Sequence, residues 1–301
     1  MPELPDITVY IEALQARIIA RRLTRIELRS PFVLRTVDPA PAALENHEVR
    51  TLRRIGKRIV WGFDDDLWLI IHLMIAGRLQ WAENPKPSRS KNILAVFHFD
   101  NGALTFTEAG SKKRASLHIV RGAQALDELD PKGLEVLECD LAQFATRLTL
   151  RNHTLKCALT DPRLYSGIGN AYSDEILHAA RLSPIQLTQK LDKHEIVRMF
   201  ESCVSVLTRW TQLLREQTGD DFPRKVTAFR PKMAVHGRYG RPCPVCDTSV
   251  QRVRYVDNEL NYCPRCQTKG RILADRSLSR LLKKDWPRTI EELELAKSSG
   301  I

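Results

Sequence analysis

The spacing of apolar residues changes along the chain, and each change marks a different kind of structure. Near the start, Ile7, Ile11, Leu14 and Ile18 recur every three or four residues, which predicts an amphipathic helix with Asp6 as a suitable N-cap. From residue 25 to about residue 120, short apolar runs alternate with turn signals. The runs occupy residues 25–28, 49–52, 58–63, 67–73, 92–99 and 103–107. They predict an antiparallel β-sandwich or barrel.

The pattern becomes helical after turn-forming residues accumulate at 127–133. Apolar residues at helical spacing predict helices near 141–148, 153–160 and 196–214. Before the last of these, Gly167-Ile168-Gly169-Asn170 predicts a tight turn into another helix, which Asn170 can cap. Amides exposed at such a helix start can bind an anion such as a DNA phosphate, but the same residues also suit a purely structural helix junction.

Four of the seven cysteines form two Cys-x-x-Cys pairs separated by 16 residues. Thiolates at this spacing suit one tetrahedral zinc ion with no position left open for water, so we expect a structural metal site. The intervening residues have strand character, which predicts a two-stranded zinc ribbon that needs the metal to fold. The predicted ligands are Cys243, Cys246, Cys263 and Cys266.

Charge narrows the choice of partners. The 301 residues include 47 Lys and Arg against 36 Asp and Glu, a net charge of +11, so the surface should attract a polyanion, with nucleic acid as the first candidate. No segment approaches 18 consecutive apolar residues, and the start of the chain lacks a signal-peptide pattern. We therefore expect no membrane span and a cytoplasmic protein, associated with the nucleoid if the source is bacterial.

The chain begins Met1-Pro2-Glu3, and removal of Met1 leaves the secondary amine of Pro2 at the terminus. An α-amino group titrates near 7.7–8.0, against about 10.4 for lysine, so it is a nucleophile near neutral pH. Attack on a sugar C1′ gives an iminium ion whose charge promotes elimination of phosphate, and Glu3 can supply the proton that opens the sugar ring. The alternative is that Pro2 and Pro5 only stiffen the start of the chain.

Three features in this order resemble the formamidopyrimidine-DNA glycosylase and endonuclease VIII family: the Pro-Glu-Leu-Pro terminus, the Gly-x-Gly-Asn turn and the four-cysteine ribbon. The resemblance implies a multi-domain α+β chain. Its parts are a β-sandwich catalytic domain with an N-terminal helix at 1–126, a helix-two-turn-helix domain at 127–220, a zinc finger at 221–270 and an extension at 271–301. It further implies a monomer that binds damaged double-stranded DNA and abasic-site DNA.

The resemblance also assigns roles to single residues. Pro2 corresponds to the Schiff-base nucleophile, Glu3 to the proton donor and Lys57 to a lysine near the phosphate and sugar of the lesion. The implied activity is removal of oxidised bases followed by β/δ-elimination at the abasic site. Ile75 takes the place of a residue that fills the gap left by the flipped base. The positions that match contacts to the DNA backbone are His72, Lys156 and Asn170. By themselves, a lysine at a strand end and a lone histidine are also common structural residues.

The chain departs from the family pattern at several places. Residues 108–114 replace the segment that supplies the other gap-filling residues, and Asn258 stands where many members have an arginine. The stretch 218–234 is short where 8-oxoguanine enzymes have a longer loop over the base. We therefore expect formamidopyrimidines and oxidised pyrimidines to be preferred over 8-oxoguanine. The residues after Cys266 fit either a basic helix or a solvated extension, and we favour the extension.

Two other functions fit part of the sequence. A non-catalytic zinc-ribbon DNA-binding protein explains the charge and the cysteines, and retention of Met1 would favour it. A zinc-stabilised RNA or ribosomal factor explains the same features but leaves the Pro-Glu terminus without a role.

Overall fold

The computed structural model describes residues 1–298 except 111, 225, 228, 256–258, 276–278 and 282–285. The chain divides into two compact units. Unit 1 combines residues 1–133 with residues 209–228, and unit 2 combines residues 134–208 with 229–301. The predicted four-domain division is finer and stays a prediction, although residues 209–220, assigned there to the helical domain, pack within unit 1.

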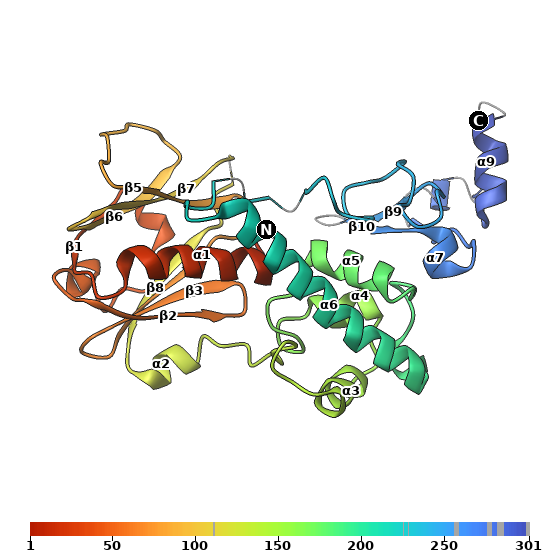
Figure 1. Cartoon of the computed structure of the whole chain (residues 1–301), viewed down its shortest axis with the longest axis horizontal. Coiled ribbons are helices and arrows are strands. Elements are labelled where there is room, and N and C mark those ends of the chain that lie inside the picture. Colours follow the sequence, from red (N-terminus) through yellow and green to blue (C-terminus); the bar gives the residue numbers. More distant parts are fainter. Residues whose placement is uncertain are drawn as a thin grey trace. The chain divides into compact units, whose positions relative to one another are not determined.

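Unit 1 contains two four-stranded antiparallel sheets in its described part. The first has the order β1-β6-β7-β5, and the second has the order β2-β3-β4-β8 (Figure 1). This confirms the predicted β-sandwich. Asp100-Asn101-Gly102 turns the chain between the paired strands β6 and β7, as its sequence indicates. The strands are β1 (Leu23–Leu28), β2 (Val49–Ile55), β3 (Arg58–Phe63), β4 (Leu67–His72), β5 (Gly77–Ala82), β6 (Ile93–Phe99), β7 (Gly102–Glu108) and β8 (Ser116–Arg121).

Helix α1 (Leu4–Ile18) is buried on nearly every side because it packs against both sheets. It contacts β2 and β3, and the Tyr10 hydroxyl accepts a hydrogen bond from the Leu79 amide of β5 at 3.4 Å. Glu3 is the N-cap, so the prediction of Asp6 was wrong. Pro5 fits the first turn of the helix, and the Asp6 carboxylate reaches back to the Glu3 amide at 3.0 Å, which starts the helix three residues earlier.

The segment after helix α6 (Lys193–Thr218) completes the core of unit 1. Phe222 and Val226 are buried in the same cluster as α1 and the sheets, and the Phe222 ring lies 5.7 Å from that of Tyr10. The Arg215 guanidinium binds the Glu12 carboxylate at 2.6 Å. The end of α6 and the residues after it therefore pack on α1, although Arg215 and Glu12 are 203 positions apart in sequence.

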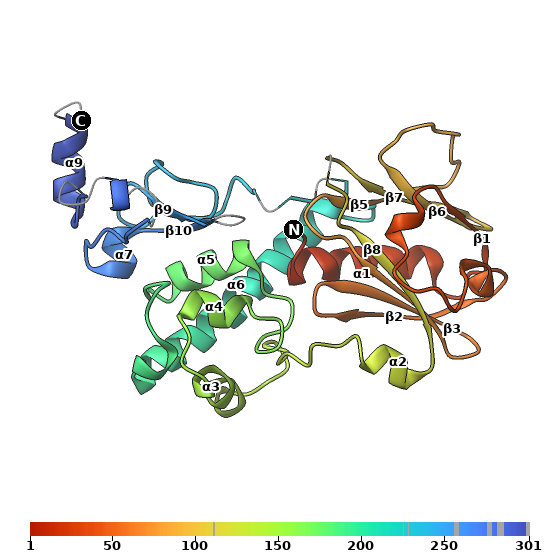
Figure 2. The ribbon, with the colours of Figure 1, turned by 180° about the vertical axis from the view of Figure 1, so that it is seen from behind.

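Unit 2 begins with the predicted helices, which are confirmed. They are α3 (Leu141–Thr149), α4 (Leu155–Thr160), α5 (Asn170–Ala179) and the first part of α6 (Figure 2). The short α2 (Ala123–Asp127) lies in unit 1. Gly169, with extended φ and ψ, is the N-cap of α5, and Asn170 is its first helical residue, so the predicted cap was displaced by one position. Gly167 supplies a left-handed conformation (φ +79°) to the turn before it.

The ribbon consists of β9 (Gln251–Arg254) and β10 (Glu259–Tyr262), followed by α7 (Pro264–Thr268). This confirms the predicted two-stranded ribbon, while Asn258 lies outside the described residues. The sequence favoured a solvated extension after Cys266, but part of this extension packs on the ribbon. Leu273 packs with Val253, Leu260 and Tyr262 of the ribbon, and a helix, α9 (Ile290–Ser298), follows. No helix in the described ranges is long and apolar enough to cross a membrane.

Candidate active site and zinc centre

The α-amino group of the chain lies among buried and charged groups of unit 1. Burial lowers its pKa from the ordinary value because desolvation disfavours the ammonium form. The Glu3 carboxylate raises this pKa, whereas the nearby cations Arg78 and Lys57 lower it further. An amine with a lowered pKa is unprotonated over a wider pH range, so a larger fraction of it is available as a nucleophile near neutral pH. The amine belongs to Met1 here, and Pro2 directly after it is buried.

Glu3 is held in place by the start of α1. Its side chain is only 2% exposed, its amide donates to Asp6, and its carbonyl accepts the first helical hydrogen bond from Ile7 at 2.9 Å. The start of the helix therefore holds Glu3 in place, and Pro2 is the residue directly before it.

His72 lies in a row of polar residues across the second sheet. It pairs in register with Arg58 of β3 on one side and Ser116 of β8 on the other. Burial, followed by the charges of Arg58 and Lys57, lowers the pKa of His72 to about 4. Its imidazole is therefore neutral near pH 7 and can donate an N–H to an oxygen atom without adding a charge. Lys57 occupies the turn between β2 and β3.

The turn between β4 and β5 presents Ile75, whose side chain is 58% exposed. The Gly77 amide closes the turn on the Leu73 carbonyl at 2.8 Å. A Cβ atom at Gly77 would lie 2.2 Å from that carbonyl oxygen, so only glycine fits. The Arg78 guanidinium donates to the carbonyls of Gly77 (2.6 Å) and Ile75 (3.2 Å). Arg78 thus connects the turn between β4 and β5 to the surroundings of the amine. Arg78 was not identified from the sequence, because an arginine in a strand is a common surface residue.

Glu108 organises the base of the loop after β7. Its carboxylate is 1% exposed and accepts the amides of Arg114 at 3.0 Å and Ala115 at 3.1–3.3 Å. Lys113 donates to the Glu108 carbonyl and to Asn92 Oδ1. The loop that replaces the gap-filling segment is therefore closed by a buried carboxylate, and Ser111 lies outside the described residues.

Asn170 and Lys156 lie together in unit 2. The Asn170 side-chain amide donates to the Glu259 carbonyl of β10 at 2.8 Å. The Lys156 ammonium donates to the Asn170 carbonyl (2.7 Å), Ser173 Oγ (2.8 Å) and Asp174 Oδ1 (2.5 Å). Both residues belong to the Gly-x-Gly-Asn turn and its helices, while Pro2, Glu3, Lys57, His72 and Ile75 belong to unit 1.

Two buried carboxylates of α5 fasten the helix to the segments around the ribbon. Asp174 Oδ2 accepts from His236 Nδ1 at 2.8 Å and from the Asn261 amide at 3.1 Å. The Glu175 carboxylate accepts the amides of residues 234–236 at 2.7–3.0 Å. Burial raises the pKa of Glu175 although these hydrogen bonds oppose it. These contacts give Glu175 a structural role, because its carboxylate holds the backbone of residues 234–236 against α5.

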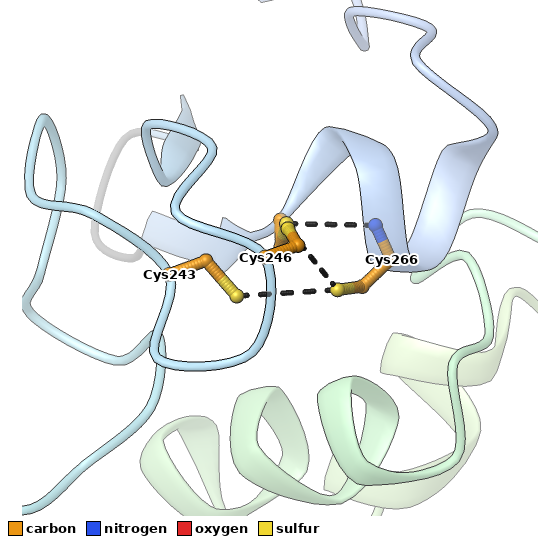
Figure 3. Close-up of side chains that lie close together, drawn as sticks. Cys243, Cys246 and Cys266 are labelled. Carbon is orange, nitrogen blue, oxygen red and sulfur yellow. Dashed lines mark hydrogen bonds between the residues drawn. The ribbon is translucent and has the colours of Figure 1, made fainter.

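The four predicted cysteine ligands meet at one point, and Figure 3 shows three of their sulfur atoms pointing toward one another. All four Sγ atoms lie within 4.8 Å of one another. The separations are 3.9 Å for Cys243 and Cys266, 3.4 Å for Cys246 and Cys263, and 3.5 Å for Cys246 and Cys266. A tetrahedron of Zn–S bonds of about 2.3 Å requires S–S distances of about 3.8 Å, so the donor set fits one zinc ion.

His178 of α5 contacts this centre. Its Nε2 lies 3.3 Å from the Cys243 sulfur, and both residues are buried. Burial lowers the pKa of His178 to about 4, so the ring is neutral and can donate one N–H to a thiolate. This contact could not be predicted from sequence, because 65 residues separate the two positions.

Three family models match consecutive parts of the chain. They describe the formamidopyrimidine-DNA glycosylase N-terminal domain at residues 1–111, the formamidopyrimidine-DNA glycosylase H2TH domain at 130–218 and a zinc finger found in FPG and IleRS at 240–269. The last match covers all four cysteines, and the ribbon is a structural zinc site.

Curated relatives match over most of the chain. The formamidopyrimidine-DNA glycosylase of Symbiobacterium thermophilum is 30% identical over 281 residues, which cover 89% of each protein. A formamidopyrimidine-DNA glycosylase-like protein of Mycobacterium tuberculosis is 41% identical over 155 residues, 52% of this chain and 94% of the relative.

Solved structures agree with the fold. A complex of the LlFpg protein with a THF-DNA and an inhibitor superposes with a TM-score of 0.78 at 25% identity, covering 89% of this chain and 100% of the other. A Lactococcus lactis FPG mutant in complex with a Fapy-dG containing DNA gives a TM-score of 0.77 with the same identity and coverage.

Proposed function

The chain belongs to the formamidopyrimidine-DNA glycosylase family, whose members act in base-excision repair, and we propose that it is a bifunctional glycosylase and abasic-site lyase. It removes an oxidised base from double-stranded DNA and then cleaves the strand. The observation that carries this proposal is the position of buried Pro2 directly before the buried carboxyl group of Glu3, in surroundings where burial and the cations Arg78 and Lys57 lower the pKa of the Met1 amine.

Pro2 is the nucleophile in this reaction, after removal of Met1. Its nitrogen attacks C1′ of the damaged nucleotide as the bond to the base breaks, and the base leaves with the bonding electrons and takes up the proton that the Pro2 nitrogen gives up. Glu3 then protonates the ring oxygen as the sugar opens to the iminium ion. The resulting iminium ion acidifies C2′, so loss of a C2′ proton expels the 3′ phosphate. A second elimination expels the 5′ phosphate, and water then releases Pro2.

Four other side chains handle the DNA. Lys57 and a neutral His72 bind phosphate oxygens near the lesion, and Ile75 enters the space that the flipped nucleotide leaves. Asn170 binds the DNA backbone from the first turn of α5. The exposure of Ile75 and the neutral state of His72 support these roles. Zinc holds the ribbon together and takes no part in bond breaking.

The preferred substrates are formamidopyrimidines and oxidised pyrimidines, followed by 8-oxoguanine. The segment after α6 supports this order, because Phe222 and Val226 are buried in the core of unit 1 and leave little chain for a lid over the base. Equal or faster single-turnover excision of 8-oxoguanine from a matched duplex would contradict it. The protein acts as a cytoplasmic monomer, at the nucleoid in a bacterial cell.

Borohydride trapping on abasic-site DNA tests the central step. Reduction of the iminium should give a stable adduct that peptide mapping places on Pro2. An adduct on Lys57 would remove Pro2 from the mechanism, and no adduct at all would favour a non-catalytic DNA-binding protein. Intact-mass analysis of the same preparation confirms that Met1 is absent. Glu3→Gln should abolish base excision but leave part of the cleavage at a preformed abasic site.

A further inference from the structure

Lys156 uses all of its hydrogen-bond donors inside the protein. An ammonium group has three N–H donors, and the structure provides three acceptors at 2.5–2.8 Å, namely Asn170 O, Ser173 Oγ and Asp174 Oδ1. The Lys156 side chain is only 12% exposed. A DNA phosphate could bind this ammonium only by displacing one of these partners. The geometry therefore argues against the phosphate contact that the family resemblance implies for this position.

Asp174 makes this arrangement costly to break. Its side chain is fully buried, with 0% exposure, and the Lys156 ammonium is the cation that binds its Oδ1 atom. The other oxygen accepts from His236 and from the Asn261 amide of β10. A buried carboxylate needs such compensation because the protein interior solvates a charge poorly. Removing Lys156 alone leaves the Asp174 carboxylate without the ammonium group that pairs with its Oδ1 atom.

The same lysine fixes Asn170 from one side while the ribbon fixes it from the other. Lys156 holds the Asn170 carbonyl, and Glu259 of β10 accepts the Asn170 side-chain amide. Helices α4 and α5 lie side by side in both views of the chain (Figure 2). The turn, α5 and the ribbon thus share one connected set of polar contacts within unit 2.

We propose that Lys156 is a positioning residue, which sets the place of Asn170 by neutralising Asp174 and does not itself contact DNA. This inference rests on the proposed function in one respect, because it assumes that Asn170 binds the DNA backbone. The contacts among Lys156, Asp174 and the ribbon do not depend on that assumption.

The salt dependence of binding separates the two roles of Lys156. Affinity for a duplex with a tetrahydrofuran abasic-site analogue is measured from low to moderate salt for the wild type and Lys156→Met. Loss of a phosphate contact lowers the slope of log K against log salt by about 0.9, whereas loss of a positioning residue leaves the slope unchanged. We expect the unchanged slope together with about tenfold weaker binding. Lys190→Met, which removes an exposed charge from the same unit, controls for net charge.

A double-mutant cycle provides the decisive comparison. Asp174→Asn removes the buried charge that Lys156 neutralises, so Asp174→Asn combined with Lys156→Met should recover most of the lost affinity. A double variant no better than Lys156→Met would overturn the proposal, as would a reduced salt slope. In lyase assays on abasic DNA, Lys156→Met should raise KM and leave kcat nearly unchanged, because Pro2 and Glu3 lie in unit 1.

Hydrogen exchange of the zinc-loaded protein without DNA tests the contact itself. In Lys156→Met, the amides of residues 170–174 should exchange faster, and Asp174→Asn in the same chain should restore their protection. Unchanged protection in Lys156→Met would also refute the positioning role. If the wild type failed to form a borohydride adduct, the proposed function would fail, while this measurement would still decide the role of Lys156.

Discussion

Glu108→Gln tests whether a buried carboxylate controls the loop that replaces the missing gap-filling segment. Glutamine keeps the shape of the side chain but removes the charge and turns one acceptor into a donor. The two amides of Arg114 and Ala115 now bind a charged group, with each such bond worth about 1.5–3 kcal/mol, against about 0.5–1.5 kcal/mol for a neutral one. Part of the loss is offset because a charge no longer has to be buried.

We therefore expect Glu108→Gln to lower the free energy of unfolding by about 2 kcal/mol. For a unit of roughly 150 residues this corresponds to a fall in Tm of about 4–8 °C. Calorimetry measures the shift. Glu48→Gln is the matched control, since it removes the same charge from the exposed pair with Arg50, and its effect should stay below about 1 kcal/mol.

The functional readout is opening of the duplex, which is monitored by the fluorescence of 2-aminopurine placed opposite the lesion. If the loop fills the gap, Glu108→Gln should slow base excision more than cleavage at a preformed abasic site, where no base has to be extruded. A Tm equal to that of the control would show that the carboxylate does not hold the loop. If the rates of base excision and of cleavage at a preformed abasic site fell equally, the loop would have no specific role in base extrusion.

Three further predictions follow from the site. Because the pKa of His72 is about 4 in the folded protein and near 6.5 unfolded, the unfolded state binds more protons between these values, and stability falls as pH decreases from 6.5 to 4. In urea titrations, the free energy of unfolding of His72→Asn should fall less between pH 7 and pH 5 than that of the wild type. The control His194→Asn, at an exposed position, should show the same fall as the wild type. An identical fall in the two variants would contradict the burial argument. Gly77→Ala should cost about 1–3 kcal/mol and weaken base extrusion, because its Cβ meets the Leu73 carbonyl, and a fully stable variant would disprove the clash. Cys263→Ser should release zinc to a chromogenic chelator and weaken DNA binding while the thermal transition of unit 1 persists; retained zinc with full affinity would refute the four-thiolate site.

Local patterns predicted most of the fold. The ribbon followed from the cysteine spacing together with the strand character of the residues between the two pairs, and the helices of unit 2 followed from apolar periodicity. Strands β5 and β8 were missed because neither contains a long apolar run. In β8, Leu117 and Ile119 alternate with polar residues, so a search for alternation would have found it. In β5, pairing of Leu79 with Phe106 of β7 sets the strand, and that contact joins distant residues.

The site was predictable only where its residues are neighbours in sequence. Pro2 and Glu3 are adjacent, so their shared chemistry could be inferred. The partners of Lys156 could not, because its acceptors lie 14–18 positions away on another helix. Arg78 and His178 gave no signal for the same reason, since their significance comes from groups brought near by folding.

The zinc centre makes this protein sensitive to the oxidants that create its proposed substrates. The thiolates that hold a structural zinc ion are open to oxidation, and their conversion to a disulfide or sulfenic acid removes the ligands of the metal. Cys243 and Cys263 are buried, but Cys246 and Cys266 remain partly exposed. We expect this second pair to react first, while burial and the His178 contact protect the Cys243 sulfur. Oxidation of this pair would remove two of the four zinc ligands, so recovery of the folded ribbon would require both reduction of the thiols and rebinding of zinc.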